Sequence, residues 1–438
     1  MKDYHWFASS ILAMKKLHAQ KYNFEYYLSG MNNTSDVFRI GGVSVKDLAN
    51  EFGTPLYVYH AEKISEQIKR LRLAFPEKTS IRFAAKALTS LAILDLMRKE
   101  GVGLDCVSIQ EVKLGLQAGF NPSSITYTPN NVSITEVEEA VALGVEITLD
   151  NLPILKKFGE QFGNKVPAGI RLNPNIMAGG NLKISTGHSH SKFGISILQM
   201  EEIQSIVGRH NININGLHIH TGSELKDHEV FMNMANILFD AAVLFPNLKF
   251  LDFGGGFKVA YRDNDAVTDI GKVGALLGER LKEFNAKNSM SIELRIEPGK
   301  FLVSEAGFLI TEVTVIKETP SVTFVGVNTG LNHLIRPMMY DAWHDIINGT
   351  NQTGQTKTYT VTGNICETDT FGKDRILPEV KEGDLLVMLN AGAYGYSMAS
   401  NYNSRFRPAE VLIKNGKAFL IRRRDTMEDL TRGQIIPS

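Results

Sequence analysis

Apolar segments and helical patterns alternate through the middle of the chain. Eight short apolar segments have the length of buried β-strands, at residues 80–87, 102–108, 125–130, 145–151, 168–174, 215–223, 249–256 and 292–299. Between them apolar residues recur every third or fourth position, as over 91–100, 110–118, 135–143 and 230–245. This spacing predicts amphipathic helices. Strands that alternate with helices pair in parallel, so eight such units predict an α/β fold built on a (β/α)8 TIM-like barrel.

Beyond residue 299 the helical spacing stops, but strand-like segments continue. They lie at 309–317, 321–327, 358–361, 384–389, 409–413 and 418–421, with the hairpin-turn pair Asn415-Gly416 between the last two. We therefore predict that the barrel occupies residues 60–304 and that a C-terminal all-β domain follows over 305–438. Residues 37–60 also have strand character, which predicts that the N-terminal segment 31–59 packs with the β domain.

The first 30 residues need a separate interpretation. Asp3 lies where a signal peptide carries positive charge, and no small-residue cleavage site follows the apolar stretch. We interpret residues 1–30 as a loosely attached extension, either disordered or translated ahead of a natural start at Met31.

Charge and cysteine content narrow the class of protein. The 438 residues carry 47 Lys and Arg against 47 Asp and Glu. Nucleic acids and membrane surfaces attract concentrated positive charge, so this balance argues against both as partners. No apolar run reaches the roughly 18 residues of a membrane helix. Two cysteines are too few for a disulfide framework and suit a reducing compartment, so we expect a cytoplasmic enzyme.

Polar residues and glycines gather at the C-terminal ends of the eight predicted strands. They are Lys86, Asp105, Ser108, Asn130, Asp150, Arg171, Asn173, His220, Ser223, Gly254, Gly255, Gly256 and Glu297. Loops that follow strands are polar in any protein, but this general tendency explains one or two such residues and not a ring of them. Because active sites of barrel enzymes lie at this face, the ring predicts the position of the active site.

Three sites among these residues suggest a chemistry. Lys86 ends an apolar strand, where desolvation is expected to depress its pKa and make it a Schiff-base nucleophile; the alternative is a lysine that extends to solvent. Gly254, Gly255 and Gly256 let backbone N–H groups approach a phosphate, although three glycines also suit a tight turn. Glu297 could keep a pyridine nitrogen protonated, or simply pair with Lys300.

His218 and His220 project to the same face of their strand. Such a pair can bind zinc, but the seventh and eighth strands supply no further histidine, so we expect no metal site. The other interpretation uses His220 as a flat ring stacked on a cofactor.

Taken together, FAAKA, LDCVSIQE, HTGS, GGG and EPGK resemble motifs of the pyridoxal 5′-phosphate-dependent decarboxylases that act on ornithine, lysine, arginine or diaminopimelate. That family has an alanine-racemase-like barrel followed by a β domain. The resemblance implies that Lys86 forms the Schiff base and that His220 stacks on the cofactor ring. Further cofactor contacts are implied for Asp105, Arg171, Ser223, Gly254, Gly255, Gly256, Glu297 and Tyr394.

The resemblance extends into the β domain. GNICETD, with Cys366 and Glu367, is similar to a C-E-S segment that reaches the partner subunit's active site. It implies a homodimer with active sites at the interface, in which Cys366 returns a proton to Cα. Substrate contacts are implied for Lys300, Arg336, Tyr340, Glu367 and Tyr394.

A glutamate after the cysteine distinguishes members that act on diaminopimelate from relatives with C-D. Diaminopimelate keeps a zwitterion at its non-reacting end, for which Arg336 and Glu367 offer one cation and one anion. The resemblance therefore implies conversion of meso-2,6-diaminopimelate to L-lysine and CO2, the last step of lysine biosynthesis.

Three alternatives stay open. They are a decarboxylase for carboxynorspermidine or a basic amino acid, an amino-acid racemase, and a cofactor-binding protein without catalysis. The chain also departs from the family at Leu88, Glu224 and Lys300, where asparagine, glutamine and arginine are usual.

Overall fold

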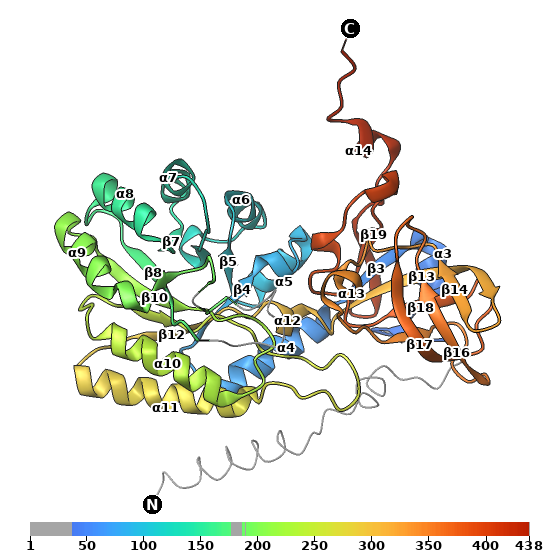
Figure 1. The fold of residues 1–438 in the computed structure, drawn as a ribbon, viewed down its shortest axis with the longest axis horizontal. Coiled ribbons are helices and arrows are strands. Elements are labelled where there is room, and N and C mark those ends of the chain that lie inside the picture. Colours follow the sequence, from blue (N-terminus) through green and yellow to red (C-terminus); the bar gives the residue numbers. More distant parts are fainter. Residues whose placement is uncertain (1–36, 177–185, 189, 438) are drawn as a thin grey trace, which may run out of the picture.

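A closed barrel and a β domain lie side by side in the computed structural model, which describes residues 37–176, 186–188 and 190–437 (Figure 1). The interpretation of residues 1–30 falls outside these ranges. The barrel strands are β4 (Ser80–Ala84), β5 (Gly103–Cys106), β6 (Ile125–Tyr127), β7 (Glu146–Leu149), β8 (Ala168–Asn173), β10 (Ile214–Ile219), β11 (Phe250–Asp252) and β12 (Glu293–Ile296). Each pairs in parallel with the next, and β12 pairs with β4, so the predicted eight-stranded barrel is confirmed.

Helices surround the barrel on its outside (Figure 1). They are α4 (Ala61–Ala74), α5 (Leu91–Lys99), α6 (Ile109–Gln117), α7 (Ile134–Ala142), α8 (Leu152–Phe162), α9 (Met200–His210), α10 (His228–Ala242) and α11 (Ile270–Asn288). Polar side chains start several of them, as where Ser108 accepts a hydrogen bond from the Glu111 N–H and Asn151 from the Ile154 N–H. Such caps let a helix begin directly after the loop that carries the site residues.

The β domain is a mainly antiparallel sheet in the order β17-β16-β14-β13-β3-β19-β20. Its strands are β3 (Leu56–His60), β13 (Gly307–Glu318), β14 (Thr323–Val327), β16 (Thr356–Thr362), β17 (Thr370–Pro378), β19 (Ala409–Lys414) and β20 (Lys417–Arg422), with β15 (Ile346–Asn348) and β18 (Leu385–Met388) off this path. The predicted C-terminal all-β domain is thus confirmed. β3 lies between β13 and β19, although it precedes the barrel in the sequence.

The β domain differs from the expectations in two of its larger elements. Residues Val45–Phe52 form the helix α3, not a strand, because Ser44 caps its N-terminus and Val45 and Leu48 bury one helical face. The strand β17 was not predicted, because exposed polar residues such as Lys373 and Asp374 interrupt its apolar positions.

The chain passes twice between barrel and β domain, from β3 into α4 and from β12 through α12 (Lys300–Val303) into β13. This second crossing places Lys300 and the β domain next to the C-terminal ends of the barrel strands. Smaller elements complete the fold: β1 (Arg39–Ile40), β2 (Val43–Ser44), β9 (Ile195–Ser196), α13 (Arg336–Tyr340) and α14 (Met427–Thr431). Among the described residues, no helix has the length and apolar character that would let it cross a bilayer.

A buried histidine makes the stability of the β domain depend on pH. His333 Nε2 lies 3.0 Å from the Phe406 carbonyl, which can only accept a hydrogen bond, and Nδ1 lies 2.9 Å from the Thr329 hydroxyl. Burial is the main cause that lowers the pKa of His333 to about 4, so the folded state keeps this ring neutral.

We expect His333→Gln to flatten the stability profile at acidic pH. Because the folded pKa lies below the unfolded one, the stability that the neutral ring contributes is lost as pH falls below about 6.5 toward 4. Between pH 7.5 and pH 5, His333 should therefore lower the free energy of unfolding of the wild-type protein by about 2 kcal/mol, and the variant should lack this decrease. Urea unfolding of both proteins at several pH values measures it, and parallel curves would contradict the expectation.

Candidate active site

A cavity at the C-terminal ends of the barrel strands brings the predicted residues together. Its lining includes Lys86, His220, Ser223, Gly256, Glu297, Lys300 and Tyr394, together with Ala84, Phe257, Pro298, Gly299 and Phe301. These residues come from loops after four barrel strands, from α12 and from the β domain. The sequence thus identified most of the polar lining, including Tyr394, whose N–H donates to the Ala87 carbonyl at 2.9 Å.

Lys86 follows β4 in a short 3-10 turn, and its Nζ lies 3.7 Å from Oδ2 of the buried Asp105. Burial acts to lower the pKa of Lys86, but Asp105, Tyr394 and Glu297 together outweigh it, so the pKa is raised. The expected depression of this pKa is therefore wrong, because three anionic or ionisable groups from other segments face the lysine. Burial also raises the pKa of Asp105, to about 6.

Glu297 is part of a buried acidic pair at the strand ends. Burial raises the pKa of Glu297 and, with the charge of Glu297, raises that of Asp252 to about 7. His218 Nε2 lies 3.1 Å from Glu297 Oε2, and burial lowers the pKa of His218 to about 4. The two acids therefore hold a shared proton more readily than isolated carboxylates do, next to a neutral imidazole.

His218, Asp252 and Glu297 place ligand atoms within 4.8 Å of one another. The prediction from the sequence considered His218 only together with His220, and it did not include Asp252. Asp252 could have been found from its place within the apolar segment LDFGGG. A charged residue in a buried strand is costly unless it has a partner or a function. The absence of a metal site stays a prediction.

The glycine loop after β11 is tightly packed. Gly254 and Gly256 have φ of +63° and +89°, a backbone region that L side chains rarely adopt. A Cβ on Gly256 would lie 2.4 Å from the Gly222 carbonyl oxygen, and one on Gly254 would lie 2.7 Å from His220 Nδ1. Glycine is required here because the loop passes directly against His220 and its neighbours.

Lys300, which lines the cavity, forms an ion pair with Glu224. Its Nζ lies 3.0 Å from Glu224 Oε1, so the two departures from the family pattern form one ion pair. Glu224 has a φ of +66°, which costs an L-residue about 1 kcal/mol and shows that its position is held by the surrounding structure.

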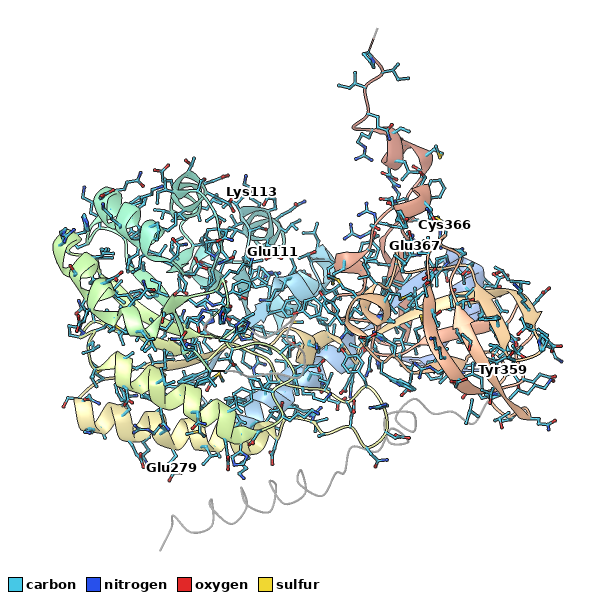
Figure 2. The ribbon with its side chains drawn as sticks, in the orientation of Figure 1. Glu111, Lys113, Glu279, Tyr359, Cys366 and Glu367 are labelled. Carbon is cyan, nitrogen blue, oxygen red and sulfur yellow. The ribbon has the colours of Figure 1, made fainter. Side chains whose placement is uncertain are left out.

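Other predicted residues lie outside this cavity wall. Arg171 is buried, with Cζ 4.8 Å from the centre of the Phe193 ring, and its charge acts on Glu297 from a distance. Arg336 and Tyr340 lie on α13, the former buried and the latter half-buried. Cys366 and Glu367 are exposed on the β domain, away from barrel residues such as Glu111 (Figure 2).

Comparison with known proteins gives the family. A family model described as "Pyridoxal-dependent decarboxylase, pyridoxal binding domain" matches residues 61–304. A diaminopimelate decarboxylase from Methanothermobacter thermautotrophicus is 38% identical over 413 residues, which cover 91% of this chain and 96% of the relative. The chain belongs to the diaminopimelate decarboxylase family.

Two further relatives agree with this family. The diaminopimelate decarboxylase of Escherichia coli K12 is 35% identical over 402 residues, covering 87% of this chain and 94% of that one. A crystal structure of diaminopimelate decarboxylase from M. jannaschii in co-complex with L-lysine superposes with a TM-score of 0.84 at 31% identity. It covers 92% of this chain and 97% of its own.

The cofactor of this family is pyridoxal phosphate, and the cavity fits it chemically. His220 Nδ1 and Asp105 Oδ1 are buried and have no hydrogen-bond partner among the described residues. Burial lowers the pKa of His220 well below its usual value, which leaves a neutral, flat ring. A lysine amine, an acidic pair and a glycine loop complete the set that such a cofactor needs.

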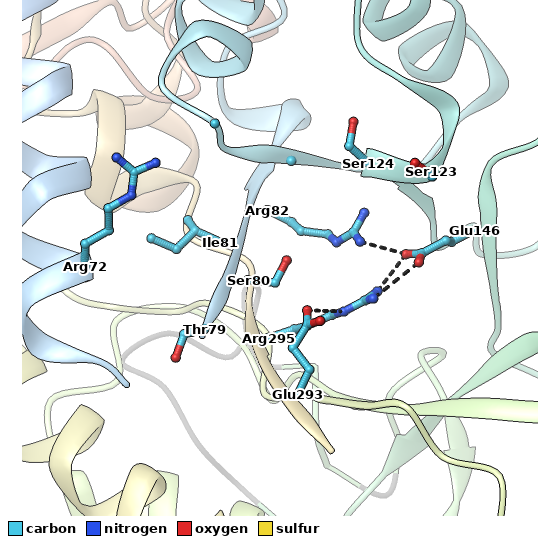
Figure 3. A pocket seen from close by; sticks show the side chains of 12 residues that line it. Arg72, Thr79, Ser80, Ile81, Arg82, Ser123, Ser124, Glu146, Glu293 and Arg295 are labelled. Carbon is cyan, nitrogen blue, oxygen red and sulfur yellow. Dashed lines mark hydrogen bonds and ion pairs between the residues drawn. The ribbon is translucent and has the colours of Figure 1, made fainter. Parts of the chain in front are cut away.

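A second cavity lies at the opposite, N-terminal end of the barrel (Figure 3). There Glu146 Oε2 lies 2.8 Å from Arg82 Nη2 and 2.6 Å from Arg295 Nη1, so one carboxylate joins two largely buried guanidinium groups. Arg295 also contacts Glu293 at 3.1 Å, while Arg72 lies near Glu100. Positive and negative charges balance in this group, which indicates a structural role at the face where barrels are stabilised.

We expect Glu146→Gln to lower the free energy of unfolding by about 3 kcal/mol, because two buried like charges would lose their shared partner. The enzyme that stays folded should keep its kinetic constants, since the active site is at the other end of the barrel. Glu293→Gln is the matched control and should cost no more than about 1 kcal/mol, because that pair is more exposed. Equal losses in the two variants, measured by denaturant unfolding, would contradict this account of the network.

Proposed function

We propose that this enzyme uses pyridoxal phosphate to convert meso-2,6-diaminopimelate to L-lysine and CO2. The observation that carries the proposal is the single cavity in which Lys86, His220 and Glu297 meet the glycine loop, in a chain whose relatives over most of its length are diaminopimelate decarboxylases. In that cavity Lys86 would bind the cofactor aldehyde. Ser223 and the N–H groups of Gly254, Gly255 and Gly256 would hold its phosphate.

The remaining cofactor contacts follow from burial and charge. His220 would stack on the ring, because its neutral imidazole offers an uncharged flat face. Glu297 would accept a hydrogen bond from the protonated ring nitrogen, since a buried carboxylate stabilises a nearby cation. Asp105, Arg171 and Tyr394 would set the electrostatic field around Lys86, and Tyr394 would also contact the substrate.

When bound, pyridoxal phosphate supplies an electron sink for the electron pair that CO2 leaves behind. The protein's own contribution is orientation and proton control. The Asp252–Glu297 pair holds a proton near the ring nitrogen, and the raised pKa of Lys86 keeps its amine protonated until a base accepts that proton. Asp105, whose pKa is about 6, is the nearest carboxylate to Nζ and is suited to that exchange.

The substrate's non-reacting end carries one carboxylate and one ammonium. Arg336, Lys300 and Tyr340 are assigned to the carboxylate, and Glu367 is assigned to the ammonium. A decarboxylase for lysine or ornithine would have no use for the cations at this end, because its substrates carry no carboxylate there.

The proposal requires a second copy of the chain. Cys366 and Glu367 are exposed and engaged only locally, since Asn403 Nδ2 donates to Cys366 Sγ at 3.2 Å and the Tyr402 hydroxyl donates to Glu367 at 2.9 Å. Neither residue lines the cavity of its own chain. We infer a homodimer in which this segment completes the neighbouring site, where the Cys366 thiol would protonate Cα after CO2 leaves.

Two further assignments accompany the proposal. The division into a cofactor barrel over 60–304 and a β domain over 305–438 is supported by the family match that ends at residue 304. A cytoplasmic location is supported by the free thiols of Cys106 and Cys366, which suit a reducing compartment.

The proposed reaction can be tested by measuring CO2 and L-lysine release from meso-diaminopimelate, with ornithine, lysine and carboxynorspermidine in parallel. We expect turnover of diaminopimelate only, and at least a thousandfold loss in Lys86→Ala, because the other amine that lines the cavity, Lys300, is held in an ion pair with Glu224. Turnover of another substrate in its place would refute the substrate assignment. Racemisation without CO2 release would refute the reaction.

The shared site predicts complementation between two inactive variants. Lys86→Ala and Cys366→Ala should each have little activity as separate dimers. After subunit exchange, about a quarter of wild-type activity should return, because half of the dimers are mixed and each mixed dimer has one intact site. An exchanged mixture that stays as inactive as the two variants alone would refute a site built from two chains.

A further inference from the structure

A buried tyrosine lies close to both Lys300 and Arg336. Tyr261 follows the glycine loop and is 6% exposed. Its ring centre lies 4.9 Å from Arg336 Cζ and 5.8 Å from Lys300 Nζ. Tyr261 therefore contacts both residues that are assigned to the same substrate carboxylate.

The hydrogen bonds around Arg336 have only one consistent direction. Nη1 donates to the Tyr261 hydroxyl oxygen at 2.9 Å and lies 3.2 Å from His344 Nε2. His344 Nδ1 lies 2.9 Å from the Leu389 carbonyl, which can only accept, so Nδ1 carries the hydrogen and Nε2 accepts from Arg336. Burial is the main cause that lowers the pKa of His344 to about 3, which keeps this ring neutral.

The Tyr261 hydroxyl accepts a hydrogen bond from Arg336 and donates its own hydrogen to Ser304. It lies 2.9 Å from Ser304 Oγ, and Ser304 in turn lies 3.3 Å from the Asn390 carbonyl. Because that carbonyl only accepts, Ser304 donates to it and accepts from Tyr261. Arg336, Tyr261, Ser304 and the Asn390 carbonyl thus form a donor chain that ends on the backbone of the β domain.

These hydrogen bonds use only the Nη1 end of the Arg336 guanidinium, so its other nitrogens remain available to a ligand. Nη1 has two hydrogens, and both are given to Tyr261 and His344. Nε and Nη2 make no hydrogen bond with any described residue. These two nitrogens form the edge with which a guanidinium binds a carboxylate through two parallel hydrogen bonds.

Charge in this group indicates the ligand that would bind there. Lys300 and Arg336 carry two positive charges, and Glu224 supplies one negative charge through its contact with Lys300. One positive charge is left over in a largely buried place, where an unpaired charge is costly. A single carboxylate would neutralise it.

We propose that Tyr261 is a positioning residue that fixes Arg336 by its Nη1, so that the Nε and Nη2 edge receives the carboxylate at the substrate's non-reacting end. This inference rests on the proposed function, because it needs a substrate with such a carboxylate. It assigns to Tyr261 a role in substrate affinity and selectivity and none in the bond-breaking step.

Tyr261→Phe removes the hydroxyl and keeps the ring. In the holoenzyme, we expect the KM for meso-diaminopimelate to rise about tenfold while kcat stays within about twofold, because the anchored edge would serve substrate and transition state alike. L-lysine retains the non-reacting end, so its inhibition constant should rise by the same factor. The inhibition constant of 1,5-diaminopentane, which has no carboxylate, should not change.

Tyr359→Phe is the matched control. Tyr359 is also buried, and its hydroxyl accepts a hydrogen bond from the Val380 N–H at 3.2 Å, at the far side of the β domain (Figure 2). This variant loses a comparable hydrogen bond and should keep the wild-type KM. If Tyr261→Phe does not fold, Ser304→Ala removes the acceptor of the Tyr261 proton and should raise KM about threefold.

The outcomes separate the two hypotheses. A wild-type enzyme that does not decarboxylate diaminopimelate overturns the proposed function and this inference together. A wild-type enzyme that does so, with an unchanged KM in Tyr261→Phe, overturns this inference alone. Equal weakening of L-lysine and 1,5-diaminopentane also overturns it, since that would indicate a general disturbance of the cavity.

Discussion

Closure of the barrel between β12 and β4 is the constraint on which the site depends. The pairing of Arg295 with Ser80 and of Ile296 with Ile81 joins the last strand to the first. It brings Glu297 to the same cavity as Lys86, although the two are separated by almost the whole barrel in sequence. Without this pairing, the residues that follow β12 would not lie beside those that follow β4, and Glu297 and Lys86 would not line one cavity.

Closure also concentrates charge where water is scarce. Asp105, Asp252 and Glu297 come from three different strands, and each is buried at the same end of the barrel. Burial alone would drive Lys86 toward the neutral form, but Asp105, Tyr394 and Glu297 reverse the sign of the shift and raise its pKa. The lysine is therefore held ready by its acidic surroundings, and its reactivity depends on proton exchange within the group, not on an apolar environment.

This reversal marks the limit of what the sequence could predict. The eight barrel strands, the glycine loop, Lys86 and Glu297 were all predictable, since periodicity and residue type are local properties of the chain. The sign of the pKa shift of Lys86 was not, because it depends on groups that only the folded chain brings near: Asp105 on the neighbouring strand β5, Tyr394 in the β domain and Glu297 across the closure of the barrel. α3 was missed for a related reason: its apolar residues suited either a strand or a helix, and the cap at Ser44 and the packing decided for the helix.

The pairing of Lys300 with Glu224 illustrates the same point for specificity. Taken singly, each residue departs from the family pattern and puts the carboxylate contact in doubt. The structure shows them 3.0 Å apart, so the two changes are coupled and the net charge at the cavity edge depends on both. With Arg336 held by Tyr261 and His344, the group keeps one unmatched positive charge. A lysine at position 300 then remains compatible with a carboxylate-bearing substrate, because the bidentate contact that an arginine would make there can be supplied by Arg336.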